Sequence, residues 1–323
     1  MLIGGIDIGT LTCRLLVAEV TLPHLFHELD SDRQILRLGE GVDSHKKLSP
    51  QAMDRVVKVL KEWKTRLAAY SLDAMVVVAT SAVRDAHNQK EFLDRIMDEI
   101  GWRVEVLTGT EEARRTLLGV RFGLPENIQK FLVVDIGGGS TEYIFSSPVG
   151  LPHAVSLDLG VVRLTERILV HDPPTQAEMR AAETEIVNHL EIAKKKFGPH
   201  LPASLVGTAG TITTLAAMDQ GLARYDRTKV HHYVLSLDTI RRWEHEISQK
   251  TSLQRLAIPG LERGREQVIA AGTVIIRKTM EYFGYDRCLV SDFGLREGVL
   301  VDCATRGKSN PDCTQAGIKR NTS

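Results

Sequence analysis

The sequence is poor in cysteine and has no excess of either charge. Its four cysteines are scattered and form no CxxC pair, so neither a zinc site nor a disulfide framework is predicted. They are Cys13, Cys288, Cys303 and Cys313. Lysine plus arginine and aspartate plus glutamate both number 41. A chain with this balance is not built to coat nucleic acid, so any polyanion that it handles must be bound by a local group of residues.

Long hydrophobic runs are also missing. The apolar run at 75–79 is far shorter than the roughly 20 residues that a membrane span needs. The N-terminal stretch MLIGGIDIG lacks a basic segment and runs into a glycine turn, which is typical of a strand and not of a signal peptide. Together with the unpaired cysteines, these features predict a cytoplasmic protein that has no membrane partner.

The pattern that is present alternates strands with helices, which predicts an α/β fold. Helices are expected from Pro50 onward and at 90–99, 110–120, 175–196, 211–218, 237–248 and 263–283. Strands are expected at 2–8, 13–20, 34–38, 74–79, 104–107, 154–158, 204–206 and 287–290. A length of 323 residues suits two domains better than one core.

An internal repeat divides the chain. FLVVDIGGGSTEYIF is a strand, a glycine turn and a strand, as GGIDIGTLTCRLLV is at the start. The repeat predicts a first domain at 1–122 and a second at 123–298. A C-terminal helix at 299–310 is expected to complete the first domain. The polar tail at 305–323 is expected to be frayed.

The first loop of the repeat reads Asp7-Ile8-Gly9-Thr10. Glycine after an acidic strand end lets backbone N–H groups turn toward a phosphate. Thr10 and Thr12 add hydroxyl groups, and Asp7 could hold a metal ion through water. When this loop is taken alone, a plain hairpin turn is the better explanation.

The second loop runs from Asp135 through three glycines, Ser140 and Thr141 to Glu142. Consecutive glycines lose more conformational entropy on folding than other residues do. A folded segment that keeps them therefore usually needs a backbone without side chains. Gly137, Gly138 and Ser140 are therefore candidates for binding phosphate. Two carboxylates beside a bound phosphate would repel it unless a cation intervenes, which predicts Mg²⁺ at Asp135 and Glu142. The alternative is a flexible bulged hairpin.

A third glycine turn follows the strand at 204–206 and opens a helix. Its Thr208 and Gly210 would place backbone N–H groups and the positive end of the helix near a ligand. The alternative is an ordinary connection between a strand and a helix.

A glutamate and an arginine complete the candidates. Glu112 lies in the first turn of a helix, where a carboxylate either stabilises the helix dipole or activates an attacking water. Arg84 follows a strand end, and its guanidinium could bind phosphate bidentately or pair with Asp85. The adjacent His231 and His232 lack a third metal ligand at a suitable spacing and are interpreted as surface residues.

Together, these loops and the segments TGTEEA, ATSAVRDAHN and SDFGLREGVL resemble the exopolyphosphatase and guanosine pentaphosphate phosphohydrolase family. The resemblance runs from residue 3 to about 303. It implies an actin-like ATPase fold of two RNase H-like domains with the active site in the cleft between them. It also implies Mg²⁺-assisted attack of water on the terminal phosphate of polyphosphate or guanosine pentaphosphate.

The resemblance also assigns roles by position. Glu112 corresponds to the catalytic base, and Asp135 and Glu142 to acidic residues that handle metal and water. Gly137, Gly138 and Ser140 correspond to the phosphate-binding loop, and Arg84 to a phosphate-contacting arginine. The chain departs from the family where Leu11 replaces an amide side chain of DxGSNS, and where Arg265-Glu266-Gln267 replaces RAD.

Several interpretations stay open from the sequence. Polyphosphate and guanosine pentaphosphate would use the same motifs at the scissile phosphate, so the sequence does not choose between them. The same three loops would also suit an actin-like kinase or ATPase. A phosphate or nucleotide sensor without turnover is a further alternative. A homodimer is compatible with the apolar helices of the second half.

Overall fold

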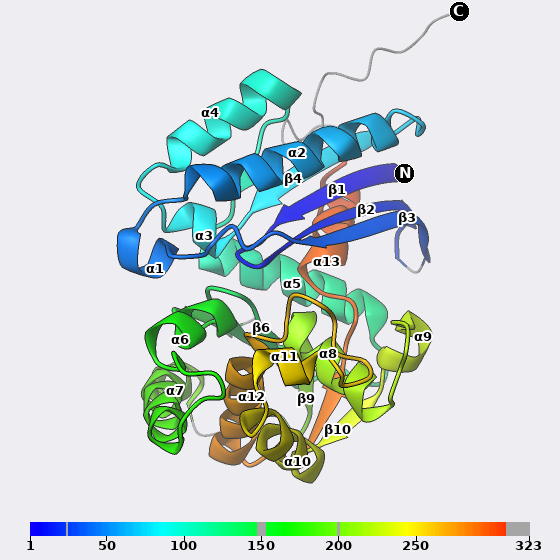
Figure 1. Cartoon of the computed structure of the whole chain (residues 1–323). Coiled ribbons are helices and arrows are strands. Elements are labelled where there is room, and N and C mark those ends of the chain that lie inside the picture. Colours follow the sequence, from blue (N-terminus) through cyan, green and yellow to red (C-terminus); the bar gives the residue numbers. More distant parts are fainter. Residues whose placement is uncertain (24, 147–152, 199–200, 308–323) are drawn as a thin grey trace, which may run out of the picture. The chain divides into compact units, whose positions relative to one another are not determined.

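Two β-sheets, each with its own helices, organise the chain (Figure 1). The computed structural model describes residues 1–23, 25–146, 153–198 and 201–307. Unit 1 comprises Met1–Phe122 and the segment from Leu295 onward, and unit 2 comprises Gly123–Gly294. The chain thus leaves unit 1 once and returns to it once.

Unit 1 holds a five-stranded sheet of order β3-β2-β1-β4-β5. Strands β1 to β3 are antiparallel, and β4 and β5 run parallel to β1. The strands are β1 Leu2–Ile8, β2 Thr12–Thr21, β3 Leu25–Ile35, β4 Ala74–Ala79 and β5 Glu105–Val106. The helices are α1 Val42–His45, α2 Pro50–Leu67, α3 Ser81–Arg84, α4 Gln89–Ile100, α5 Gly109–Gly123 and α13 Leu295–Arg306.

The two faces of this sheet are buried in separate clusters because alternate residues of a strand point to opposite faces. Ile6 and Ile8 pack with the apolar residues of α2 and α4, whereas Ile3 packs with those of α13. Gly5 lies under α13, where a Cβ would come within 2.2 Å of Leu300 Cδ1. The helix that returns from the end of the sequence therefore covers one face of the first sheet.

Unit 2 holds a six-stranded sheet of order β10-β11-β9-β6-β7-β8. Its strands are β6 Phe131–Ile136, β7 Thr141–Ser146, β8 His153–Leu157, β9 Leu205–Thr208, β10 Val234–Ser236 and β11 Arg287–Val290. Its helices are α6 Val161–Arg167, α7 Gln176–Phe197, α8 Ala209–Asp219, α9 Arg227–Val230, α10 Leu237–Ser248, α11 Ser252–Arg255 and α12 Ile269–Phe283.

Apart from the added edge strand β10, the second sheet repeats the strand order of the first. Each sheet begins with three consecutive antiparallel strands, β1–β3 in the first and β6–β8 in the second. Two strands parallel to the first of these are then added on the side of that strand, β4 and β5 in the first sheet and β9 and β11 in the second. This repeat confirms the prediction of an actin-like α/β fold built from two RNase H-like domains.

Three expectations need correction. The third strand spans Leu25–Ile35 and not 34–38. It is a half-exposed edge strand, and its many polar residues interrupt the alternation of apolar and polar side chains by which a strand is recognised. The helix expected from 263 begins at Ile269, because Gly260 and Gly264 hold positive φ values of 86° and 95° in the turns before it. The C-terminal helix spans Leu295–Arg306 instead of 299–310. The predicted frayed tail falls mostly at 308–323, outside the described residues.

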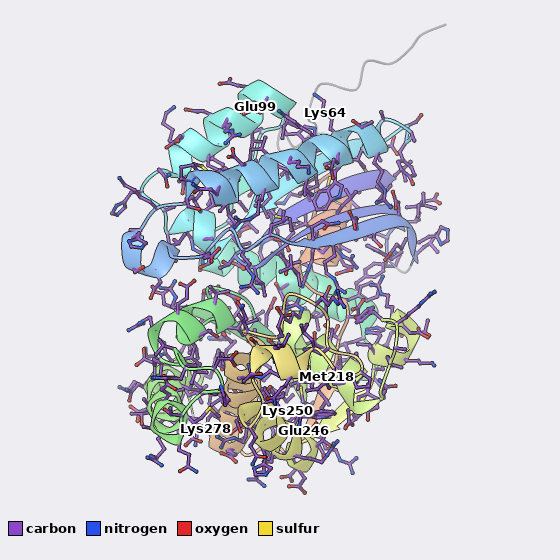
Figure 2. All side chains as sticks on the ribbon, viewed as in Figure 1. Lys64, Glu99, Met218, Glu246, Lys250 and Lys278 are labelled. Carbon is purple, nitrogen blue, oxygen red and sulfur yellow. The ribbon has the colours of Figure 1, made fainter. Side chains whose placement is uncertain are left out.

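Charged side chains cover the outer helices (Figure 2). Glu246 of α10 lies 3.4 Å from Lys250, which follows the end of that helix. Glu99 of α4 lies 2.6 Å from Lys61 of α2. Exposed pairs of this kind contribute only about 0–1 kcal/mol each to the free energy of unfolding. Within the described residues no helix is both long enough and apolar enough to cross a membrane.

The close packing of α13 on α5 gives a first test. A Cβ on Gly298 would lie 1.7 Å from the carbonyl oxygen of Arg115, so Gly298→Ala must push the two helices apart. We expect a loss of about 1–3 kcal/mol in the stability of unit 1, the usual cost of overpacking. The measurement is hydrogen exchange of α5 and α13 peptides in increasing urea.

The control for this variant is Thr305→Ala on the same helix. It removes one hydrogen bond, from Thr305 Oγ1 to the carbonyl of Val301, and adds no atoms where the helices pack. Equal protection of α5 and α13 in Gly298→Ala and Thr305→Ala would contradict the packing argument.

Candidate active site

The predicted residues of unit 1 lie around the end of β1. Asp7 is the next-to-last residue of that strand and is 7% exposed. The Gly9 N–H donates to the carbonyl of Thr12 at 3.1 Å, which closes the hairpin turn, and Thr12 opens β2. Thr10 Oγ1 accepts the N–H of Ala82 at 3.2 Å, which ties this turn to helix α3.

The structure brings Arg84 and Glu112 together. Arg84 Nη1 lies 2.9 Å from Glu112 Oε2 and 2.8 Å from the carbonyl oxygen of Leu107. Arg84 ends α3 after strand β4, and Glu112 lies in the first turn of α5. The Asp85 carboxylate is farther away, with its Oδ1 3.9 Å from Arg84 Nε. The arginine and the glutamate that the sequence singled out separately thus form one ion pair.

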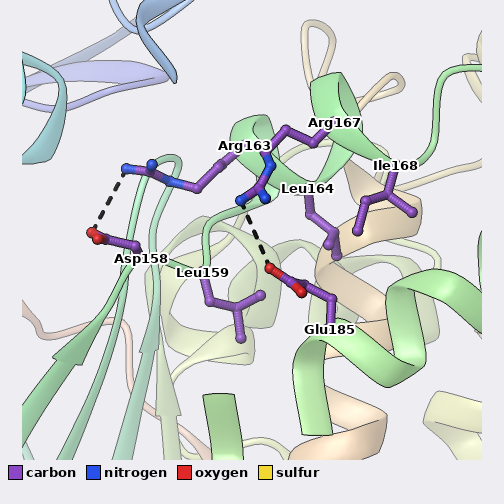
Figure 3. A pocket seen from close by; sticks show the side chains of 7 residues that line it. All are labelled: Asp158, Leu159, Arg163, Leu164, Arg167, Ile168 and Glu185. Atoms are coloured by element: carbon purple, nitrogen blue, oxygen red, sulfur yellow. Dashed lines mark ion pairs between the residues drawn. The ribbon is translucent and has the colours of Figure 1, made fainter. Parts of the chain in front are cut away.

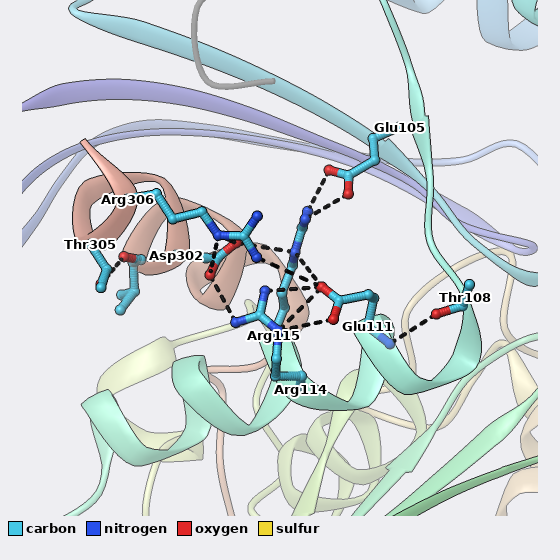
Figure 4. Close-up of polar contacts among 9 residues, drawn as sticks. Glu105, Thr108, Glu111, Arg114, Arg115, Asp302, Thr305 and Arg306 are labelled. Carbon is cyan, nitrogen blue, oxygen red and sulfur yellow. Dashed lines mark hydrogen bonds and ion pairs between the residues drawn. The ribbon is translucent and has the colours of Figure 1, made fainter. Parts of the chain in front are cut away.

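Neighbouring Glu111 faces a different group of residues (Figure 4). Its carboxylate accepts from Arg114, which also lies 2.8 Å from Asp302 of α13. Arg114 holds the pKa of Glu111 below its usual range. Buried Arg115 continues the network with a bidentate pair to Glu105 at 2.8 and 2.7 Å. Glu111 therefore joins α5 to α13, while Glu112 pairs with Arg84.

Leu11 and Cys13, which flank Thr12, point into the core. Leu11 is 4% exposed, and its carbonyl accepts the N–H groups of Leu36 and Arg37, both at 2.9 Å. Burial, with the charge of Asp7 nearby, raises the pKa of the Cys13 thiol. Burial also raises the pKa of Cys288 in unit 2, to about 12. Neither thiol is a nucleophile near neutral pH.

In unit 2, predicted residues lie side by side at the ends of three strands. Asp135 of β6 is directly opposite Glu142 of β7 in the antiparallel register and beside Thr208 of β9 in the parallel register. Opposed residues of a sheet share a face, so their side chains are neighbours. Glu142 is almost fully buried and accepts from Ser156 Oγ of β8 at 2.7 Å. The Thr208 hydroxyl donates to the carbonyl of Phe293 at 3.0 Å.

Between Asp135 and Glu142 the glycine loop, residues 137–140, turns with its carbonyls held on one side. The carbonyl of Gly137 accepts the N–H of Val161 at 3.0 Å, and that of Gly138 accepts the N–H of Val162 at 2.8 Å. The carbonyl of Gly139 accepts from the side chain of Arg163, whose Nε lies 3.0 Å away. All three donors belong to the N-terminal turn of α6.

This arrangement fixes where the N–H groups of the loop point. A trans peptide places its N–H opposite its C=O. With the carbonyls of Gly137, Gly138 and Gly139 directed at α6, the N–H groups of Gly138, Gly139 and Ser140 are directed away from it. Successive N–H groups aimed in one direction form an anion-binding concavity.

Helix α6 and its close contact with the glycine loop were not predicted from the sequence. Gly160, just before α6, allows this contact, because a Cβ there would lie 2.2 Å from the carbonyl oxygen of Gly138. The available signal was the glycine that follows strand β8 in Ser-Leu-Asp-Leu-Gly. It did not reveal what the glycine packs against.

The third glycine turn is occupied by an arginine. A Cβ on Gly210 would come within 2.3 Å of the Arg265 guanidinium, which is buried and also donates from Nε to Glu262 at 2.7 Å. Gly210 lies in the first turn of α8. Ala209, before it, has a φ of 69°, an uncommon value for a residue with a Cβ. The turn thus presents a guanidinium beside the start of a helix.

The donors fit the Mg²⁺ predicted from the sequence. Within the described ranges, no cluster of three or more His, Cys, Asp or Glu side chains is placed to hold an ion. Asp135 and Glu142 would supply two neighbouring oxygen ligands in unit 2, and Asp7, in unit 1, is a separate candidate ligand. Mg²⁺ usually binds through one or two carboxylates and keeps waters and phosphate oxygens as its other ligands. The pair of carboxylates beside the glycine loop suits an ion that arrives with a phosphate.

The close approach at Gly160 yields a second prediction. Gly160→Ala leaves an allowed backbone, with φ −131° and ψ 162°, but its Cβ must displace the glycine loop. We expect amide hydrogen exchange at Gly137, whose N–H donates to the carbonyl of Ser140 at 3.0 Å, to be at least about tenfold faster than in the native chain, because opening of the loop costs less once its carbonyls are shifted.

The matched control is Thr165→Ala, which removes only a hydrogen bond within α6, from Thr165 Oγ1 to the carbonyl of Val161. Loop exchange that stays at the native rate in Gly160→Ala would show that Gly160 is not required for the loop conformation.

Known proteins are similar to this chain over most of its length. The profile of the Ppx/GppA phosphatase family matches residues 16–306. Exopolyphosphatase 2 of Mycobacterium tuberculosis is 33% identical over 315 residues, which cover 94% of this chain and 98% of that protein.

Two solved structures are similar along almost the whole chain. The Ppx/GppA family member of Aquifex aeolicus is 35% identical with a TM-score of 0.79, covering 96% of this chain and 99% of that one. An exopolyphosphatase of Cytophaga hutchinsonii is 29% identical with a TM-score of 0.86, covering 93% and 97%. The chain therefore belongs to the Ppx/GppA phosphatase family.

Proposed function

We propose that this protein is an exopolyphosphatase that releases terminal phosphates from inorganic polyphosphate by Mg²⁺-assisted attack of water. The observation that carries the proposal is the glycine loop, whose N–H groups are aimed in one direction beside the carboxylates of Asp135 and Glu142. Relatives named exopolyphosphatase support polyphosphate as the substrate.

In the proposed reaction, unit 2 holds the phosphate that is transferred. The N–H groups of Gly138, Gly139 and Ser140 bind its oxygens, in the ground state and in the transition state alike. Asp135 and Glu142 would hold Mg²⁺, which would supply neutralisation of the phosphate charge. Little covalent chemistry is needed from the protein, because phosphoryl transfer depends mainly on positioning and electrostatic stabilisation.

Unit 1 contributes the general base in this proposal. Glu112 accepts a proton from the attacking water. Its ion pair with Arg84 gives a route for coupling this step to substrate, because a phosphate competes with carboxylate for guanidinium. A phosphate that draws Arg84 away from Glu112 releases the carboxylate to act as a base at the time when substrate is present.

The direct test measures orthophosphate release with Mg²⁺ from long-chain polyphosphate, guanosine pentaphosphate and ATP, side by side. We expect release from polyphosphate, with ATP much slower. Faster release from guanosine pentaphosphate than from polyphosphate would replace the proposed substrate. Binding of these polyanions without release from any of them would identify a sensor and reject the hydrolase.

The two adjacent glutamates allow a paired test of the general base. Glu112→Gln should lower kcat by about 10²-fold or more, because an amide cannot accept the proton of water. Glu111→Gln is the control, since Glu111 binds Arg114, whereas Glu112 pairs with Arg84. We expect it to keep kcat within about threefold while weakening the α5–α13 network.

The readout is kcat on polyphosphate for both variants, together with their urea midpoints. Equal losses of kcat in the two variants, or a native kcat in Glu112→Gln, would contradict the assignment of Glu112 as the base.

A further inference from the structure

Arg163 occupies a position that the proposed chemistry does not explain. Its side chain is 10% exposed, yet it carries a charge in the first turn of α6. Nε donates to the carbonyl of Gly139 at 3.0 Å, and Nη2 lies 3.7 Å from Oδ1 of the exposed Asp158. Burying a guanidinium costs free energy unless it is hydrogen-bonded or paired with an opposite charge. The partners of a buried arginine therefore indicate its role.

The helix N-terminus alone does not hold the whole glycine loop. The backbone N–H groups of Val161 and Val162 hold the first two carbonyls, of Gly137 and Gly138. The third carbonyl, of Gly139, is held by the Arg163 side chain. A peptide next to glycine rotates readily because glycine populates both signs of φ. The peptide between Gly139 and Ser140 therefore depends on Arg163 for its orientation.

The orientation of that peptide decides what it offers to an anion. With the Gly139 carbonyl held at Arg163, the N–H of Ser140 points to the opposite side, in line with those of Gly138 and Gly139. If the peptide rotated, it would present a carbonyl oxygen to a phosphate in place of a donor. The phosphate would then lose one hydrogen bond and face a partial negative charge that repels it.

We propose that Arg163 is a positioning residue, which fixes the Gly139–Ser140 peptide so that the Ser140 N–H faces a bound phosphate. This inference rests on the proposed function only in naming phosphate as the anion. Arg163 acts through the loop and not as a ligand in the cavity on its other side. That cavity, lined by both arginines of α6, measures only about 10 Å³, about the size of a single water.

The same helix supplies a matched control (Figure 3). Arg167 lies one turn later on α6 and leaves the helix toward Glu185 of α7, whose Oε1 is 3.7 Å from its Nη1. Arg163 instead extends toward Asp158. Arg167→Met and Arg163→Met therefore remove the same charge from the same short helix, but only Arg163→Met removes the bond to the loop.

The first arm of the test is amide hydrogen exchange at Gly137, whose N–H donates across the loop to the carbonyl of Ser140 at 3.0 Å, in the protein without ligand. We expect at least tenfold faster exchange in Arg163→Met than in the native chain or in Arg167→Met, and intermediate exchange in Arg163→Lys, which keeps the charge. Native exchange in Arg163→Met would overturn the proposal whatever the substrate is.

The second arm measures kcat and KM for tripolyphosphate with Mg²⁺. A misaligned donor weakens phosphate binding in the ground state and the transition state alike, so KM should rise about tenfold to hundredfold with kcat within about threefold. A fall in kcat at native KM, as partial unfolding gives, or an unchanged KM would overturn the proposal. A native chain that neither binds nor hydrolyses tripolyphosphate would instead reject the proposed function, and the exchange arm would still decide the role of Arg163.

Discussion

The geometry of the candidate site depends on one hydrogen-bonding constraint, the capture of three successive carbonyls by the first turn of α6. Glycine at 137, 138 and 139 makes the loop bare but also makes it flexible, and a flexible loop loses conformational entropy when it binds. Backbone N–H groups and the Arg163 side chain hold these carbonyls from one side. The anion-binding character of the loop is therefore a property of the loop and the helix together.

The same loop also sets the register of the strands that it joins. Its length places Asp135 opposite Glu142, and Thr141 is anchored by a hydrogen bond from its hydroxyl to the carbonyl of Leu159. A slip of one residue would send one of the two carboxylates to the other face of the sheet. Buried Tyr143, hydrogen-bonded to Thr279 at 2.7 Å, helps to exclude that slip. The carboxylate pair follows from the turn and from packing on the opposite face.

Local sequence patterns predicted the strands and the loops because both are encoded within a few residues. Contacts between distant segments were not predictable in this way. The sequence singled out Arg84 and Glu112 separately, but their ion pair joins two helices through residues that are 28 positions apart in the sequence. Local patterns did not reveal the network around Glu111, because its member Asp302 lies on a helix that returns at the end of the chain. Helix α6 was missed because its short apolar start has no period to recognise.

Leu11, where the sequence departs from the pattern DxGSNS, belongs to the buried apolar residues of unit 1. The Leu11 side chain is buried, and its carbonyl still accepts two backbone N–H groups, from Leu36 and Arg37. Thr10 remains tied to Ala82. A buried leucine at this position offers no polar group to a polyanion, so any binding by this loop would fall to its hydroxyl and backbone groups, while Asp7 stays at the strand end.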